Sequence, residues 1–283
     1  MNKKLIPTIL GGLGILGISS QALAYEVFTV NPNSIPGTSG FASFNADSIT
    51  GVTSGRIVMD ASTKTATETG YIQFGTFNLA GSSISGGYTG LDSAPSPTAN
   101  NYGLYLTFDL AVTYDPTSIG AFGAQNSTYT IDSLTFTLFA DPDLNTTFSI
   151  ATVSADAGIT DNGLEDIILG TGSLVIGTAD LNNLGGVGIN ATTTFELTNP
   201  AGESFFIDPR PFYNFMFSGA NNTSAGVIYN YNTGLGCTSG TCVAALQNSS
   251  ITVDFEGVPE PATLALLGIG LLGFGTSRLR KTA

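Results

Sequence analysis

The feature that most constrains the fold is an alternation of apolar and polar residues with a period of two. It covers residues 102–112, where every second side chain is apolar, and it recurs in residues 131–139 and 251–255. Successive side chains of a strand point to opposite faces, so the pattern indicates antiparallel sheets with one buried and one solvated face. Further strands are predicted at 56–60, 71–79, 148–153, 167–176, 192–197 and 212–217.

Turn-forming clusters separate these segments, for example Gly86-Gly87, Asn100-Asn101 and Asp161-Asn162-Gly163. With 36 glycines and only 10% charged residues, the chain suits short strands joined by turns better than helices. No linker or internal repeat divides residues 25–257. We therefore predict one all-β unit there, an antiparallel β-sandwich or jelly-roll-like domain, flanked by an N-terminal signal helix and a C-terminal short transmembrane helix.

The charge of this central body is strongly negative. It contains all of the acidic residues except Glu260, 20 of 21, against the three bases Arg56, Lys64 and Arg210, so its net charge is −17. Such a surface repels phosphate backbones and anionic lipid headgroups. Nucleic acid is therefore excluded as an expected partner.

The first 24 residues have the three parts of a secretory signal. Lys3 and Lys4 form a positive start, an apolar Leu/Ile/Gly-rich run follows, and Ala22-Leu23-Ala24 supplies an A-x-A cleavage site. We expect translocation by the Sec translocon and cleavage by signal peptidase between Ala24 and Tyr25. An uncleaved anchor is the alternative, although the run is short for a bilayer span.

Export gives the two cysteines a natural role. Cys237 and Cys242 enclose Thr-Ser-Gly-Thr, a turn-like spacer. In an oxidising compartment this spacing predicts a local disulfide, with a free pair as the alternative. A structural zinc site is hard to build from two thiols in a chain with no histidine.

Residues 258–283 also have three parts in order. Val258-Pro259-Glu260-Pro261 is followed by a Leu/Gly-rich apolar run, and then by the basic residues Arg278, Arg280 and Lys281. The prolines end the preceding strand, and the apolar run is shorter than the ~20 residues of a comfortable span. The basic end obeys the positive-inside preference, which places the body outside the inner membrane. A core-facing helix is the alternative.

This tail resembles the PEP-CTERM sorting signal. The resemblance implies recognition by an exosortase, a membrane cysteine transpeptidase of bacteria that make exopolysaccharide. It further implies transient anchoring in the inner membrane, followed by processing beside Pro259-Glu260-Pro261 and a final location at the cell surface or in the extracellular matrix.

The body resembles the flocculation-associated PEP-CTERM family. The stretches that carry the likeness are short and lie at residues 41–51, 102–105, 139–142, 195–198 and 205–213. The resemblance implies a role in cell aggregation together with secreted polysaccharide. It supplies no catalytic residues.

The sequence offers little for catalysis. Without histidine, neither a Ser-His-Asp nor a Cys-His arrangement can form. We therefore expect a non-catalytic extracellular matrix or surface protein that promotes floc formation. The alternatives are a glycan-binding module and a carbohydrate-active enzyme that carry the same tail.

Calcium is the one cofactor that the sequence suggests. Asp161, Asn162, Glu165 and Asp166 cluster around Gly163, and residues 141–145 form a second oxygen-rich stretch. Hard oxygen ligands in a loop suit Ca²⁺, although the spacing is not that of an EF-hand. A solvated acidic loop is the other interpretation.

The aromatic run at residues 205–217 also has two interpretations. Its alternating spacing favours a core strand, and a platform for sugar rings is the alternative.

Overall fold

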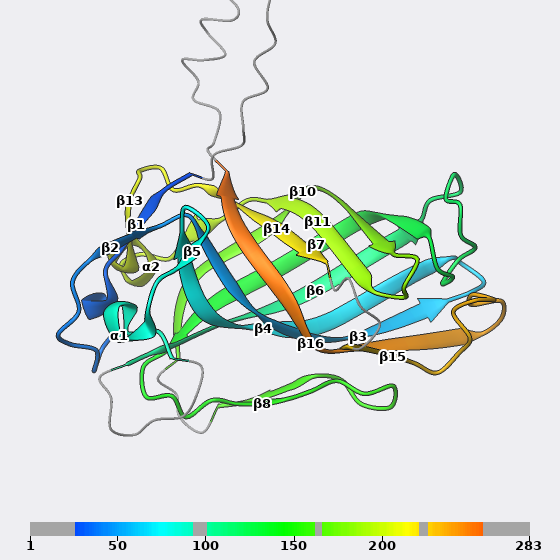
Figure 1. Ribbon diagram of the computed structural model, residues 1–283, viewed down its shortest axis with the longest axis horizontal. Helices are drawn as coiled ribbons and strands as arrows, with labels where there is room; N and C mark the ends of the chain where they lie inside the picture. Colours follow the sequence, from blue (N-terminus) through cyan, green and yellow to red (C-terminus); the bar gives the residue numbers. More distant parts are fainter. Residues whose placement is uncertain (1–25, 93–100, 162–165, 221–225, 257–283) are drawn as a thin grey trace, which may run out of the picture.

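The protein is described by a computed structural model that covers residues 26–92, 101–161, 166–220 and 226–256. The main feature of the fold is one antiparallel sheet that closes on itself (Figure 1). Each of its eight main strands pairs with two neighbours in the circular order β3-β4-β6-β7-β10-β11-β14-β16, and β16 returns to β3. These strands are β3 (Ser48–Asp60), β4 (Thr65–Leu79), β6 (Gly103–Tyr114), β7 (Ser127–Asp141), β10 (Ile167–Leu181), β11 (Val187–Thr193), β14 (Asn214–Ala220) and β16 (Thr241–Glu256).

The predicted all-β class and antiparallel pairing are confirmed, but the sandwich or jelly roll of two packed sheets is wrong. Two pairings close the sheet: β10 with β11 in the register Leu181↔Val187, and β16 with β3 in the register Thr241↔Asp60. Alternation reports which face of a strand is buried, and that face looks the same in a sandwich and in a closed sheet. The difference lies in edge pairing, and closure leaves the main strands without a free edge.

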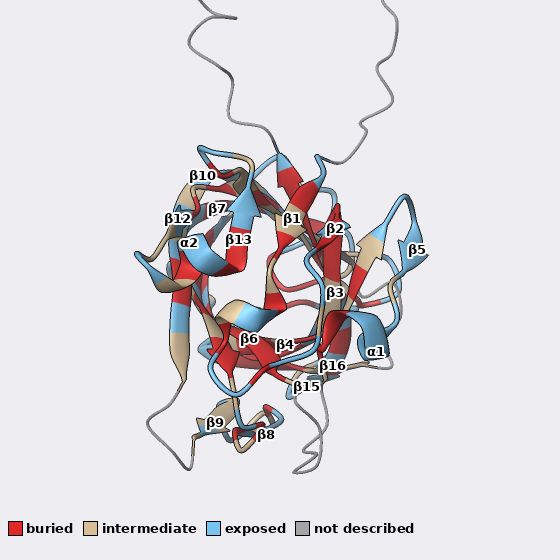
Figure 2. Ribbon diagram, turned by 90° about the vertical axis from the view of Figure 1, so that its left-hand side faces the viewer, coloured by how far each residue is buried: buried red, intermediate tan, exposed pale blue. Residues whose placement is uncertain are grey.

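Short elements cover one end of the closed sheet, which we call the capped end (Figure 2). A three-stranded sheet of order β13-β1-β2 crosses it, with two short helices nearby. The opposite end, called the far end, is formed by the connections at residues 61–64, 115–126 and 182–186. The capping elements are β1 (Phe28–Val30), η1 (Pro32–Ser34), β2 (Phe44–Ala46), α2 (Ala201–Phe205) and β13 (Phe206–Asp208).

The remaining elements attach to the outside or to strand ends. Residues 142–161 form an arm that leaves β7 and contains the separate hairpin of β8 (Thr147–Ser149) and β9 (Gly158–Thr160). Smaller pieces are β5 (Ser82–Ser83) beside β4, α1 (Gly86–Thr89), β12 (Glu196–Leu197) beside β10, and β15 (Val227–Tyr229) beside β16.

The core fills the inside of the closed sheet. Toward the capped end it is built from phenylalanine: the Phe255 ring lies 4.3 Å from that of Phe28 and 4.8 Å from that of Phe215. Phe206 and Phe212 complete this cluster, and all five rings are buried. The aromatic side chains of residues 205–217 therefore lie mostly in the core, as the alternating spacing favours.

The predicted strands are largely present, with one clear exception. All of residues 102–112 except Tyr102 fall within β6, and residues 251–255 fall within β16. Residues 148–153 were predicted as a strand, but regular structure there ends at Ser149, because the segment belongs to the arm and has only β9 to pair with.

The two predicted terminal helices lie outside the described residues. Within the described ranges, none of the helices is long and apolar enough to cross a membrane.

Candidate functional site

The described chain begins and ends side by side at the capped end. Glu256, the last residue of β16, pairs with Asn214. Tyr213, which precedes Asn214, donates a hydrogen bond from its hydroxyl to the Val27 carbonyl oxygen at 3.2 Å. Figures 1 and 2 both place these two ends of the body on the same side. Only Gly257 and Val258 separate β16 from Pro259, so the proline-containing motif follows a main strand of the closed sheet directly.

The residues predicted to form the export and sorting signals lie outside the described part of the chain. These are Ala22, Ala24 and Tyr25 at the cleavage site, Val258, Pro259, Glu260 and Pro261 in the motif, and Arg278, Arg280 and Lys281 in the basic tail.

The arm lies on the opposite side of the closed sheet from the two chain ends (Figures 1 and 2). Hydrogen bonds and an ion pair hold it against the outer face of β3 and β16. The Ala151 amide donates to Ser54 Oγ at 2.8 Å, and Gln247 Nε2 donates to the Ala151 carbonyl oxygen at 2.9 Å. Arg56 forms an ion pair with Asp156 at 3.1 Å.

Beside the base of the arm lies a cavity of about 310 Å³, which we call the outer pocket. Its floor is the outer face of β4 and β6, at Gln73 and Tyr105, and Asp92 and Asp141 lie at its side. Phe148 reaches it from the arm. The pocket therefore combines aromatic rings with carboxylates.

The two aromatic residues that line the outer pocket, Tyr105 and Phe148, meet edge to face, and Tyr105 also stacks on a third ring, that of Phe139. Tyr105 and Phe139 are neighbours on β6 and β7, with ring centroids 4.9 Å apart and an interplanar angle of 11°. Phe148 meets the edge of Tyr105 at 5.5 Å and also contacts Tyr71 at 5.0 Å. The stack thus fixes the orientation of the Tyr105 hydroxyl.

The polar part of the outer pocket joins the two oxygen-rich stretches seen in the sequence. Tyr105 Oη donates to Asp166 Oδ2 at 2.5 Å, and Thr146 Oγ1 donates to the same oxygen at 3.1 Å. The Thr146 amide donates to Asp141 Oδ2 at 3.1 Å. Asp141 Oδ1 is buried without a hydrogen-bond partner in the described structure.

Burial is the main cause of the raised pKa values in this pocket. It raises the pKa of Asp141, and the nearby Asp143 carboxyl raises it further. Burial also raises the pKa of Asp166, to which the charges of Asp141 and Asp161 add. The Tyr105 hydroxyl has a raised pKa because of burial and its bond to Asp166, so it remains a hydrogen-bond donor.

The calcium prediction stays a prediction. Asp166 does meet the second acidic stretch, through Thr146 and Asp141. Of the four predicted ligands, Asn162 and Glu165 lie outside the described residues. Over the ranges that the structure describes, no group of three Asp, Glu, His or Cys side chains is placed to hold a metal.

Cys237 and Cys242 form a disulfide at the far end, with Cα atoms 5.9 Å apart. The Cys237 amide donates to the Phe122 carbonyl oxygen at 2.8 Å, which ties the bridged loop to the 115–126 connection. The bridge thus stands at the end of the closed sheet opposite to Glu256, the last residue of β16.

The residues of the outer pocket that sequence reasoning missed are its aromatic ones. Tyr105 and Phe139 occupy the phase of their strands that is otherwise polar, beside Thr107 and Thr137. A large ring on a face expected to be wet is the signal that could have identified them. Phe148 carried a misleading signal, because it begins a short alternating segment of which only Phe148 and Ser149 belong to a strand.

The comparisons with known proteins address the tail. A family model described as the PEP-CTERM protein-sorting motif matches residues 257–281. No curated protein and no solved structure matches the chain. The match confirms the predicted sorting signal and implies an exported surface protein that an exosortase processes. It does not extend to the flocculation-associated family suggested by the body.

Proposed function

We propose that the protein is a non-catalytic component of the extracellular matrix that associates with secreted polysaccharide and promotes cell aggregation. The observation that carries this proposal is the sorting motif at residues 257–281, placed directly after β16. Exosortase substrates are sorted at the inner membrane, so the body would be held there by its C-terminus until the tail is processed.

The position of the outer pocket supports contact with a glycan. While the tail holds the protein at the membrane, the chain ends mark the tethered side of the body, and the arm lies on the opposite side. A pocket beside the arm would therefore face away from the tether.

The chemistry of the outer pocket also fits a sugar. Tyr105 and Phe148 in its lining offer apolar ring surface. The carboxylates of Asp141 in the lining and of Asp166, which is bonded to the lining residue Tyr105, can accept hydrogen bonds from hydroxyl groups. Asp141 Oδ1 has no partner of its own. Bridging by Ca²⁺ between these acids and an anionic polysaccharide is a second way in which the same pocket could act.

Co-sedimentation of the exported protein with the polysaccharide of the producing cells tests the binding role. The Asp166→Asn substitution keeps the size of the side chain but removes its charge, and we expect about tenfold weaker binding because charged hydrogen bonds contribute about 1.5–3 kcal/mol. Asp208→Asn is the matched control, since Asp208 is an exposed acid at the capped end and should bind as the unmodified protein does. Equal binding by both variants would contradict a role for the outer pocket.

A deletion strain tests aggregation itself. Cells that lack the protein but still secrete polysaccharide should form fewer flocs, and normal aggregation would contradict the proposal. Turnover of the polysaccharide by the purified protein would instead favour the carbohydrate-active enzyme.

A further inference from the structure

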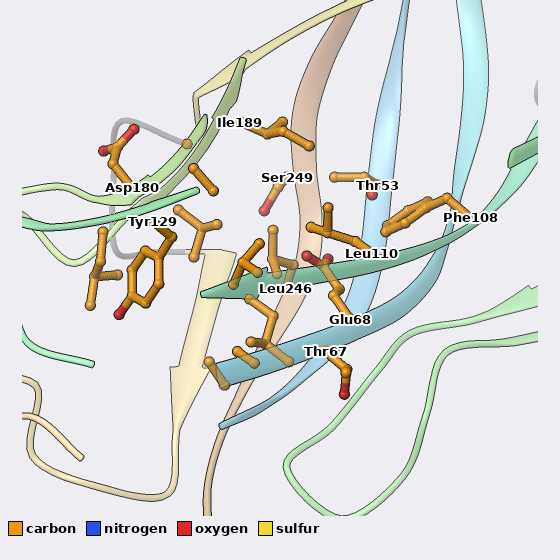
Figure 3. A pocket seen from close by; sticks show the side chains of 18 of the residues that line it. Thr53, Thr67, Glu68, Phe108, Leu110, Tyr129, Asp180, Ile189, Leu246 and Ser249 are labelled. Carbon is orange, nitrogen blue, oxygen red and sulfur yellow. The ribbon is translucent and has the colours of Figure 1, made fainter. Parts of the chain in front are cut away.

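The inside of the closed sheet is not filled along its whole length. Between the phenylalanine cluster and the far end lies a cavity of about 100 Å³, which we call the inner cavity (Figure 3). Its walls are mainly apolar, and among the side chains that form them are Met59, Leu110, Leu134, Ile189, Phe217 and Ile251. Apolar cavities of about 150 Å³ accept benzene, so this smaller space of about 100 Å³ suits a ligand no larger than benzene.

One carboxyl group projects into this apolar space. Glu68 follows Ala66 on the inward phase of β4, and its cross-strand neighbours are Ile57 on β3 and Leu110 on β6. Figure 3 shows its side chain among Leu110, Leu246 and Ser249. Glu68 is only 8% exposed, and within the described structure it has neither a hydrogen bond nor an ion pair.

The backbone around Glu68 leaves space for its carboxylate. A Cβ atom at Gly55 would lie 2.3 Å from Glu68 Oε1, so any larger residue at that position would displace the carboxylate. Glycine here lets the carboxyl group lie against β3 within the inner cavity. An unpaired buried carboxyl is costly, because nothing in the apolar surroundings replaces the water it has lost.

The tyrosine hydroxyl groups of the cavity wall already have partners. Tyr229 donates to the Gly185 carbonyl oxygen at 2.6 Å, and Tyr231 donates to that of Gly123 at 2.9 Å. The Tyr129 hydroxyl accepts from the Gly123 amide at 2.9 Å. The fourth titratable group, Asp180, is an exposed residue beside Gly188.

We propose that the inner cavity binds a small apolar amine, whose hydrocarbon part fills the space and whose ammonium group pairs with the Glu68 carboxylate. The wall that the structure describes includes no Lys or Arg, so a cationic ligand meets no repulsion from it. Pairing would supply the missing hydrogen bonds of Glu68, and an ion pair in a dry site is stronger than one at the surface.

Pair formation also moves a proton. Burial raises the pKa of Glu68 to about 8, so near pH 6 this carboxyl is protonated. Binding of an ammonium ion then releases the carboxyl proton to the buffer, and the carboxylate and ammonium remain as the pair. Burial raises the pKa of Tyr129, Tyr229 and Tyr231, which therefore stay neutral, and it also raises that of Asp180.

Isothermal titration calorimetry with pyrrolidine, a five-membered cyclic amine, tests the proposal on the full chain. We expect saturable binding, with one proton released near pH 6, seen as a dependence of the heat on the ionisation enthalpy of the buffer. The Glu68→Gln substitution should weaken pyrrolidine binding by about tenfold or more and abolish the proton release. Cyclopentane, which has a ring of the same size but no amine, should bind both proteins equally.

Two further variants keep the test decisive. Glu196→Gln removes an exposed acid on β12 and should leave binding and proton release unchanged. Ile251→Phe retains Glu68 but fills the inner cavity, and it should abolish binding of pyrrolidine and cyclopentane alike. The proposal is overturned if pyrrolidine shows no saturable binding at millimolar concentration, if binding releases no proton, or if Ile251→Phe binds as the unmodified protein does.

Discussion

The two halves of the closed sheet are built from the same strands but are filled in different ways. Toward the capped end, Phe28, Phe212 and Phe255 pack ring against ring, with centroids of each pair 4.3 to 6.1 Å apart. Toward the far end, smaller inward residues such as Ala66 and Ala244 leave the inner cavity. The backbone pairing is continuous through both halves, so the difference arises from side-chain volume alone. One half serves mainly stability, and the other retains space for a ligand.

The largest effect should come from truncation in the packed half. Phe255→Ala removes a buried ring that contacts four other phenylalanines, and we expect a loss of about 3–5 kcal/mol in the free energy of unfolding. Leu246→Ala, in the wall of the inner cavity, should cost about 2 kcal/mol, at the low end for such changes. Denaturant titration measures both. Equal losses would show that the two halves are packed alike.

The second effect concerns pH. The pKa of Glu68 is raised from 4.5 to about 8 in the folded protein, so between these values the folded state holds a proton that the unfolded state has lost. The contribution of Glu68 to the free energy of unfolding is therefore fully present below pH 4.5. It falls as the pH rises to 8, by about 1.4 kcal/mol for each pH unit. Glu68→Gln should remove about 3 kcal/mol of the decline between pH 5.5 and 7.5.

Denaturant titrations at the two pH values provide the measurement. Asp141, Asp166 and Asp254 also have pKa values raised by burial, so a decline in the same direction should remain in the variant. A variant whose pH dependence equals that of the unmodified protein would place Glu68 in contact with water rather than in the dry cavity.

The third effect concerns the disulfide at the far end of the closed sheet. Replacing both Cys237 and Cys242 by serine opens a small loop, and loop-closure entropy predicts a loss of roughly 2 kcal/mol. Calorimetric melting with and without reductant gives the same comparison in the unmodified chain. If reduction leaves the melting temperature unchanged, the 115–126 connection is held by its other contacts.

The smallest effects should differ in sign between the halves. Ala244→Val adds two methyl groups toward the inner cavity and should stabilise the protein by about 1 kcal/mol. Ala140→Val makes the same change at a fully buried position of β7 near the capped end, where overpacking should cost about 1–3 kcal/mol. Thermal unfolding of the pair measures the difference, and a shared sign would contradict the contrast in packing.

The periodicity of apolar residues in the sequence was sufficient to predict individual strands and their buried faces. Residues 102–112 identified β6, because each inward side chain of that strand is apolar. The closure of the sheet could not be derived, since the pairing of β3 with β16 joins segments about 190 residues apart and no local pattern encodes it. Residues 148–153 misled because Phe148 is half-buried by contact with the outer aromatic rings, and the strand that contains it ends at the next residue, Ser149.

The candidate sites differ in how far the sequence alone could identify them. The sorting tail could be identified from its residues alone, because membrane insertion and processing depend on a local order of motif, apolar run and basic end. The outer pocket needs the structure, which brings Tyr105 and Asp166 together across 61 residues. Glu68 was overlooked because the predicted strand began at residue 71, whereas β4 begins at Thr65 and places Glu68 inside.

The intact mass of the exported protein, with and without the exosortase, tests the central claim most directly. We expect a chain that begins at Tyr25 and ends beside Pro259-Glu260-Pro261 when the exosortase is present, and one that still carries residues up to Ala283 when it is absent. A mature protein that keeps Leu264, Arg278 and Lys281 in the presence of the exosortase would show that the tail is a permanent part of the molecule.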